Sequence, residues 1–220
     1  MAAAGPGIAA DGQGQARPRK GRIREESRRR ILDAAERIFA RHGFAGATMA
    51  EIAQSIGMPK ANIHYYFGTK EELYRALVVD IVEEWRHTSD CLTVDAEPRA
   101  AITQFLREKL DLTRRRPHAA KVFGEVNARA VPADDQDYLE DVRRVLESKG
   151  QVIDAWVAAK KIQPVDGRHF LMALWAMTQY YADFDGQMRG VLGKPGLTEP
   201  DWGYIADQVV SYALRVLGIE

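Results

Sequence analysis

Seven side chains between positions 48 and 70 carry hydrogen-bond donors or flat rings and lie close together in the sequence. They are Thr48, Lys60, Asn62, His64, Tyr65, Tyr66 and Lys70. Ammonium and amide groups can hydrogen-bond to base edges in the major groove of DNA, so Lys60 and Asn62 are the best candidates for reading sequence. Hydroxyl and ammonium groups also bind phosphate oxygens, a role that suits Tyr65, Tyr66 and Lys70. Either tyrosine could instead be a half-buried packing residue.

The residue types that would support catalysis do not occur at useful spacings. There is no nucleophile elbow, no phosphate-binding P-loop and no dinucleotide fingerprint. His87, Asp90 and Cys91 could share one face of a helix. A metal site there would need a further group, such as His118, and triplets of this kind are commonly solvated. Because Cys91 is the only cysteine, an internal disulfide is excluded as well. We therefore expect neither an enzyme nor a metal or cofactor site.

Two short helices joined by a tight turn would position the donor side chains. Thr48 and Glu51 have the spacing of a capping box, in which each side chain satisfies a backbone N–H at the start of a helix. Gly57 can take the left-handed conformation that ends this helix, and Pro59 suits the first turn of the next. The first helix has one apolar face, formed by Met49, Ile52, Ala53 and Ile56. The second, over residues 60–66, is too short and polar for the core, which predicts the recognition helix of a helix-turn-helix.

A further helix is predicted to start at Thr69 and Glu72, which form a second capping box. Lys70 would lie in its first turn, where a cation opposes the helix dipole. A compensating partner is therefore expected near Lys70, and a DNA phosphate would supply one. Ahead of this unit, a helix over about 25–42 is predicted from one apolar stripe, formed by Ile31, Leu32, Ala35, Ile38 and Phe39.

These elements resemble the TetR family of transcriptional regulators. The resemblance spans residues 25–77 and is carried by three stretches in the family's order and spacing, ILDAAERIFARHGFAGATM, EIAQSIGMPKANIHYYF and TKEELYRAL. It implies an all-α protein, with a three-helix DNA-binding domain followed by a helical bundle that binds a ligand and forms a dimer. Pro59 stands where members often have Ser or Thr, and His64 where they often have an aromatic residue. The exact base contacts are therefore not transferred by the resemblance.

The charge of the chain is unevenly distributed along three expected regions. We divide the chain into a disordered basic arm (1–23), a helix-turn-helix DNA-binding domain (24–75) and a ligand-binding and dimerisation domain (76–220). The net charge is zero, yet residues 1–75 carry 13 lysines and arginines against 8 acidic residues, while the remainder carries 18 against 23. The excess is concentrated between Arg17 and Arg30. Such an arm is either a solvated tail or a phosphate contact, and beside a helix-turn-helix we favour contact with DNA.

The rest of the chain is also predicted to be helical, because no alternating run indicates a strand. We expect helices over about 70–91, 98–116, 117–130, 136–161, 168–191 and 201–217, with a loop at 131–135. No apolar run approaches the length of a membrane span. The opening stretch MAAAGPGIAADGQGQ also lacks the basic and apolar segments of a secretory signal, so a cytoplasmic protein is expected.

The last two predicted helices are apolar around much of their circumference and need cover on more than one side. The stripes on the earlier helix are Phe170, Leu174, Met177, Tyr181 and Phe184, and Leu171, Trp175, Thr178 and Ala182. Those on the later helix are Ile205, Val209, Tyr212 and Val216, and Val210, Ala213, Leu214 and Leu217. A central position in the monomer would explain these faces. Because the later helix ends the chain, we prefer a two-fold homodimer built as a four-helix bundle, the arrangement that the TetR resemblance also implies.

The C-terminal part resembles a TetR subgroup typified by the pyrimidine-utilisation repressor, with a YcdC-like C-terminal domain that senses pyrimidine bases. The resemblance spans most of residues 78–187, including VVDIVEEW, IDAWVAAKKIQPVD and LWAMTQYYADFDGQ. It implies that Trp85, Lys109, Trp175 and Gln179 line the ligand site. Indole walls suit a planar base, and the Gln179 amide can both donate to and accept from an imide edge. Each residue also has an ordinary interpretation: core tryptophans, a solvated lysine, and a glutamine at the dimer interface.

Taken together, these features predict a dimeric one-component transcriptional regulator, a repressor, that binds a palindromic operator in double-stranded DNA. A small, pyrimidine-like effector would release or reposition it. A regulator of this type with unrelated ligand specificity is one alternative. A ligand-binding helical protein without DNA function is another, and a helical-bundle enzyme is disfavoured by the missing catalytic groups.

Overall fold

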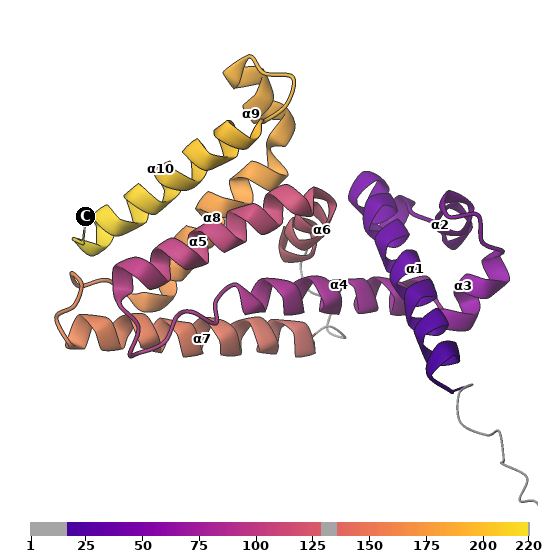
Figure 1. Ribbon diagram of the computed structural model, residues 1–220, viewed down its shortest axis with the longest axis horizontal. Helices are drawn as coiled ribbons and strands as arrows, with labels where there is room; N and C mark the ends of the chain where they lie inside the picture. The colour runs from indigo at the N-terminus through magenta and orange to yellow at the C-terminus, as the bar shows by residue number, and fades with distance from the viewer. Residues whose placement is uncertain (1–16, 129–135, 220) are drawn as a thin grey trace, which may run out of the picture.

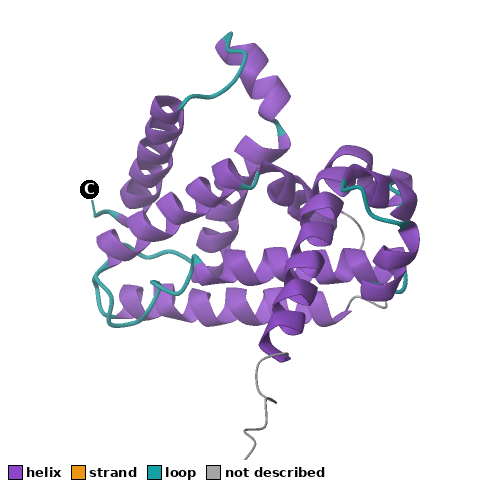
Figure 2. Cartoon of the chain, turned by 45° about the vertical axis from the view of Figure 1, so that its right-hand side comes forward, coloured by secondary structure: helices purple, strands orange, loops and turns teal. Residues whose placement is uncertain are grey.

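The computed structural model describes residues 17–128 and 136–219, and this part of the chain consists of helices and loops only (Figures 1 and 2). The all-α prediction is therefore confirmed. The helices are α1 (Arg17–Gly46), α2 (Met49–Ser55), α3 (Lys60–Tyr66), α4 (Lys70–His87), α5 (Pro98–Arg115), α6 (Pro117–Ala128), α7 (Gln136–Ala158), α8 (Gly167–Asp183), α9 (Asp185–Leu192) and α10 (Glu199–Leu217). In the described ranges, no helix combines the length and hydropathy that crossing a bilayer requires. The predicted loop at 131–135 lies outside the described residues.

Helices α1, α2 and α3 pack into a small unit at one end of the molecule, on the right of Figure 1. Phe39 of α1, Ile52 of α2 and Ile63 of α3 are fully buried in its core. The turn between α2 and α3 depends on Gly57, whose φ of 64° lies in the left-handed region that a side chain disfavours. The sequence pattern therefore predicted the helix-turn-helix, its turn and its buried face correctly.

Helix α1 begins at Arg17, which corrects the expected start at residue 25. Residues 17–23, expected in a disordered arm, are helical, while residues 1–16 lie outside the described part of the chain. Ion pairs one turn apart support the early turns, with Arg22 3.3 Å from Glu26 and Arg28 3.8 Å from Glu25. At the other end, Gly43 has φ 65° and ψ 174°, which kinks the helix before Gly46.

The two predicted capping boxes differ in outcome. Thr69 and Glu72 form the complete reciprocal pair at the start of α4. Thr48 accepts the Glu51 N–H at 3.1 Å, but the Glu51 carboxylate lies 3.0 Å from Nε2 of His42 instead of capping the backbone. The second half of that box was therefore wrong, because a partner from α1 competes for the carboxylate.

Helix α4 leaves the N-terminal unit and runs into the C-terminal body, with α7 alongside it in both views (Figures 1 and 2). It ends at His87, four residues before the expected end at Cys91. Thr88 and Ser89 donate their hydroxyl hydrogens to the carbonyls of Trp85 and Arg86. These side chains satisfy carbonyls that would otherwise need the backbone N–H groups of a longer helix.

The C-terminal body is built around α5, which packs against α8 and α10. Its core includes Leu106 of α5, Trp156 of α7, Leu174 of α8 and Val209 of α10, all buried. Helices α7 and α8 pack closely where Gly167 meets Gly150. A Cβ at position 167 would lie only 2.3 Å from the backbone carbonyl oxygen of Gly150, so only glycine fits there.

The single helix expected over 168–191 is two helices in the structure. Phe184 has φ −111° and ψ 25°, which ends α8 and starts α9. Helix α7 likewise ends three residues early, at Ala158, and Lys160 takes a left-handed φ of 56°. Neither break contains proline, so the periodic pattern carried no signal for them.

Candidate DNA-binding and effector sites

Helix α3 presents one apolar face to the core and one donor-bearing face to solvent. Ile63 is fully buried and holds the helix against α1 and α2. Lys60, Asn62 and His64 are exposed, and the side chain of Tyr65 is among the most exposed aromatic groups described, at 72%. This exposure is what contact with a DNA groove requires. Thr48 is exposed as well, but its hydroxyl oxygen is engaged as the cap of α2.

The two tyrosines of α3 have different environments. Their rings meet edge to face at a centroid distance of 5.4 Å. Tyr66 is half-buried against the core of the N-terminal unit, whereas Tyr65 projects away from it. Tyr66 is therefore partly a packing residue, whereas Tyr65 is not.

His64 is held by the turn that follows its helix. Its Nδ1 lies 2.8 Å from the Gly68 carbonyl oxygen, and because a carbonyl only accepts, Nδ1 must carry the hydrogen. This contact orients the ring and leaves Nε2 as the nitrogen that can meet DNA.

Lys70 has partners inside the protein. Its ammonium donates to the carbonyl oxygens of Phe44, at 2.8 Å, and Ala47, at 3.2 Å, and lies 4.5 Å from the centroid of the Phe44 ring. These carbonyls offset the unfavourable position of the cation in the first turn of α4, a task that we had expected a phosphate to perform. The phosphate contact of Lys70 stays a prediction. The third N–H of the ammonium, which has no carbonyl partner among the described residues, would have to make it.

A cavity of about 280 Å³ lies in the C-terminal body between α4, α5, α7 and α8. Trp85, Lys109 and Trp175, three of the four predicted ligand residues, are among its lining residues. The Trp85 indole stacks on Phe123 of α6, with ring centroids 5.2 Å apart and planes 13° apart, which makes one flat wall. A cavity of this kind suits a small planar molecule.

Two hydrogen-bond donors at the cavity have no acceptor among the residues that the structure describes. Lys109 is only 5% exposed, and burial lowers the pKa of its ammonium from 10.5 to about 8. Its Nζ lies 5.8 Å from the Trp85 ring and 5.9 Å from the Phe123 ring. The buried Nε1–H of Trp85 also lacks a partner. Buried donors of this kind are costly unless a ligand or water satisfies them.

Gln179, the fourth predicted ligand residue, does not line the cavity. Its side-chain amide nitrogen donates to the Ala120 carbonyl at 2.9 Å and to the Asp183 carboxylate at 2.8 Å. The backbone of Gly124 approaches closely there, since a Cβ on it would lie 2.9 Å from that nitrogen. Gln179 therefore joins α8 to α6, which corrects its predicted position.

Helix α7 supplies lining residues that the sequence reasoning missed. Asp141, Arg144 and Lys149 of α7 line the cavity, as does Arg86 of α4. The sequence held no signal for this contribution, because charged residues on a long amphipathic helix are usually solvated.

Comparison with known proteins agrees with this arrangement of a helix-turn-helix unit and a helical body with a cavity. Residues 31–77 match the family model of the bacterial regulatory proteins of the tetR family, and residues 78–220 match the model of the YcdC-like protein, C-terminal region. The chain belongs to the TetR family. It is a DNA-binding transcriptional regulator and not an enzyme.

Relatives of this TetR regulator cover both domains. The HTH-type transcriptional regulator RutR of Escherichia coli strain K12 is 33% identical over 175 residues, which is 80% of this chain and 82% of RutR. A tetR family protein from Rhodococcus RHA1 has a similar fold, with a TM-score of 0.71, 21% identity, and coverage of 87% of this chain and 97% of that one. AibR, solved in complex with isovaleryl coenzyme A and operator DNA, has a TM-score of 0.66 at 18% identity over 84% of this chain and 96% of AibR.

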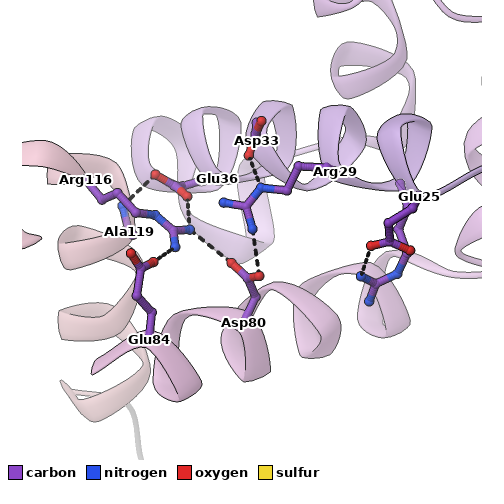
Figure 3. A network of polar contacts seen from close by, with 9 residues as sticks. Glu25, Arg29, Asp33, Glu36, Asp80, Glu84, Arg116 and Ala119 are labelled. Carbon is purple, nitrogen blue, oxygen red and sulfur yellow. Dashed lines mark hydrogen bonds and ion pairs between the residues drawn. The ribbon is translucent and has the colours of Figure 1, made fainter. Parts of the chain in front are cut away.

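A partly buried polar network connects the two domains of this TetR regulator (Figure 3). Arg116, between α5 and α6, contacts Glu36 of α1 at 2.5 Å and Asp80 of α4 at 3.2 Å, and also bonds to Glu84 of α4. Glu36 in turn accepts the Ala119 N–H at the start of α6, at 3.1 Å. One arginine therefore holds α1, α4 and the start of α6 together, where the DNA-binding unit meets the body that contains the cavity.

Proposed function

We propose that this TetR regulator is a homodimeric repressor of the cytoplasm that binds a palindromic operator and is released or repositioned by a small effector. The observation that carries the DNA part is the exposed donor face of α3. Lys60 and Asn62 are assigned to base edges, and Thr48, Tyr65, Tyr66 and Lys70 to the sugar–phosphate backbone. His64, oriented by Gly68, contributes its Nε2 to the same face.

Two exposed apolar ridges support the homodimer. Met172, Ala176, Tyr180 and Phe184 recur every four residues on α8 and are all exposed in the monomer. Tyr204, Tyr212 and Val216 form an equivalent exposed ridge on α10. Ridges spaced by four residues are the surfaces that interdigitate when helices pack, and a second copy of the chain would cover both.

Much of the remaining apolar surface of α8 and α10 is already buried within the monomer. Leu171 and Leu174 of α8, and Val209, Ala213 and Leu217 of α10, belong to the core of the C-terminal body. The central-position explanation therefore accounts for these stripes, and the dimer proposal rests on the two exposed ridges alone. A two-fold dimer would place two α3 helices to read half-sites about 34–36 Å apart.

For the effector, we propose a small planar molecule bound between Trp85, Trp175 and Lys109, with a pyrimidine base as the first candidate. The support is the resemblance of the C-terminal domain to pyrimidine-sensing relatives and the 33% identity with RutR. One observation favours a different ligand specificity: Gln179, which would pair with an imide edge, is bound to Ala120 and Asp183.

The cavity and the reading helix are connected through α4, which lines the cavity at Trp85 and starts at Lys70 beside the helix-turn-helix. A ligand that shifts α4 would change the separation of the two α3 helices in the dimer. Useful control needs the ligand to prefer the geometry that does not bind DNA by about 1–3 kcal/mol.

DNase I footprinting of the purified protein on the region upstream of its own gene tests the proposal. Two protected half-sites about one helical turn apart are expected. Absence of any protected sequence would reject an operator in this region, and a single protected half-site would reject the palindromic arrangement. For the switch, equal effector affinity with and without operator DNA would exclude the coupling.

A further inference from the structure

The charges around the cavity do not balance. Of the acidic lining residues, Glu83 is paired with Arg86 at 2.5 Å and Asp141 with Arg144 at 3.1 Å. Within the described part of the chain, Lys109 and Lys149 form no ion pair with a carboxylate, and Lys149 instead donates to the Leu92 carbonyl at 3.2 Å. Among the described lining residues, cations therefore exceed carboxylates by two, and one of these cations, Lys109, is buried.

Two donors at the cavity lack an acceptor among the described residues. The Nε1–H of Trp85 is buried without a hydrogen-bond partner, and the Lys109 ammonium, on a residue only 5% exposed, lies over the Trp85 and Phe123 rings with no hydrogen bond to an acceptor. Thr88 and Ser89 already donate their hydroxyl hydrogens to backbone carbonyls of α4. Gln179, the side chain that could have accepted from an imide N–H, is turned to α6.

We propose that the cavity selects an aromatic carboxylate, with its anionic group on Lys109 and the Trp85 Nε1–H and its ring against the indole walls. A carboxylate accepts from an ammonium and from an indole N–H alike, and it offsets a buried charge in a medium where water screens it little. A neutral imide leaves the charge uncompensated and brings N–H groups that need acceptors. This inference rests on the proposed function only in taking the cavity as the effector site.

Isothermal titration calorimetry with two matched pairs of one-ring probes tests the proposal. The pairs are uracil against uracil-6-carboxylate, and benzamide against benzoate. In each pair we expect the carboxylate to bind at least about tenfold more tightly. Equal or tighter binding of the neutral member in both pairs, or no binding of any probe at millimolar concentration, would overturn the proposal.

Variants identify the groups that give the preference. Lys109→Met keeps the length of the side chain and removes the charge, so the carboxylate preference is expected to fall to about twofold or less. Trp85→Phe removes the N–H and keeps a ring, and it should weaken carboxylate binding by a smaller factor. Lys121→Met, the same change at an exposed site on α6, is the matched control and should leave both affinities unchanged.

An unchanged carboxylate affinity in Lys109→Met would reject the assignment of the anion to Lys109. The comparison of the four probes on the unaltered protein does not depend on any variant folding. Failure here is also separable from failure of the proposed function, because footprinting needs no ligand. Operator protection without a carboxylate preference would reject this inference alone, and a carboxylate preference without operator protection would reject only the proposed operator upstream of its own gene.

Discussion

The ammonium of Lys70 connects the first turn of α4 to the end of α1 and the turn that follows it, and this contact gives the residue two separable effects. Lys70→Ala should weaken binding to all DNA sequences and reduce the slope of log K against log salt by about one, because one phosphate contact is lost. It should also lower the free energy of unfolding by about 1–2 kcal/mol, since the Phe44 and Ala47 carbonyls lose their donor.

Lys60 provides the control for this prediction. It is exposed on α3, so Lys60→Ala should change DNA binding and leave the thermal unfolding temperature almost unaltered. A lower unfolding temperature for Lys70→Ala with an unchanged salt slope would show that Lys70 has a structural role only.

Removing the buried charge of Lys109 should stabilise the ligand-free protein against unfolding. Burial lowers the pKa of its ammonium from 10.5 to about 8, so the buried charge destabilises the ligand-free protein at neutral pH. Lys109→Met should raise the free energy of unfolding at pH 7, with an upper limit on the order of 3 kcal/mol. Urea denaturation of both proteins measures the difference.

The sign of the pH dependence follows from proton binding. Between pH 8 and 10.5 the unfolded chain holds a proton on Lys109 that the native protein has released, so native stability gains with rising pH over that range. The advantage of Lys109→Met is therefore largest below pH 8 and shrinks towards pH 10. A variant that is less stable than the unaltered protein at pH 7 would contradict this account.

At the scale of helices, the network at Arg116 is where motion of α4 would be transmitted. Asp80 of α4 accepts from Arg116 and also from Arg29 of α1, at 2.8 Å. Asp80→Asn keeps the shape of the side chain and weakens both contacts. We expect it to reduce the factor by which effector lowers operator affinity, while the effector affinity of the free protein stays the same.

Asp33→Asn is the matched control for Asp80→Asn. Asp33 lies on the same helix as Arg29 and pairs with it at 3.0 Å, whereas the described ion pairs of Arg116 are with Glu36, Asp80 and Glu84. Fluorescence anisotropy with labelled operator, titrated with and without effector, measures the coupling. Equal loss of coupling in both variants would show that the ion pairs of Arg29 matter in general, and that its contact with Asp80 of α4 has no special role.

Loss of Arg116 itself should have a larger effect on folding. Glu36 is buried, and removing its cation leaves an uncompensated charge between α1, α4 and α6. Arg116→Met should lower the free energy of unfolding by about 3–5 kcal/mol. Chemical denaturation measures this loss, and a cost below about 1 kcal/mol would show that Glu36 finds another partner.

At the scale of the whole molecule, the proposed dimer depends on exposed side chains of α8 and α10. Tyr212→Glu places a charge in the ridge on α10, so the variant should sediment as a monomer of 24.7 kDa at concentrations where the unaltered protein is a dimer. Its operator affinity should fall sharply, because a single α3 reads only one half-site.

Val94→Glu is the control for the dimer prediction, because Val94 is equally exposed but lies in the loop between α4 and α5, away from both ridges. It should remain dimeric. A monomeric unaltered protein, or a dimeric Tyr212→Glu protein, would reject the ridges as the interface.

Local sequence determined the helix-turn-helix and the family. The cap at Thr48, the turn at Gly57, the capping box at Thr69 and Glu72 and the apolar spacing of α2 all act within a few residues, so their types and order are sufficient to predict them. Three of the four predicted cavity residues, Trp85, Lys109 and Trp175, were recoverable as well, through the resemblance of the C-terminal domain.

Only the tertiary structure decided which groups meet across the molecule. It assigned Lys70 to the carbonyls of Phe44 and Ala47, turned Gln179 towards Ala120, and placed α7 along the cavity. It also brought Arg116 to three acidic residues that lie 32 to 80 positions away in the chain. These contacts depend on how whole helices pack, and the spacing of residues within one helix contains no information about the side chains on its neighbours.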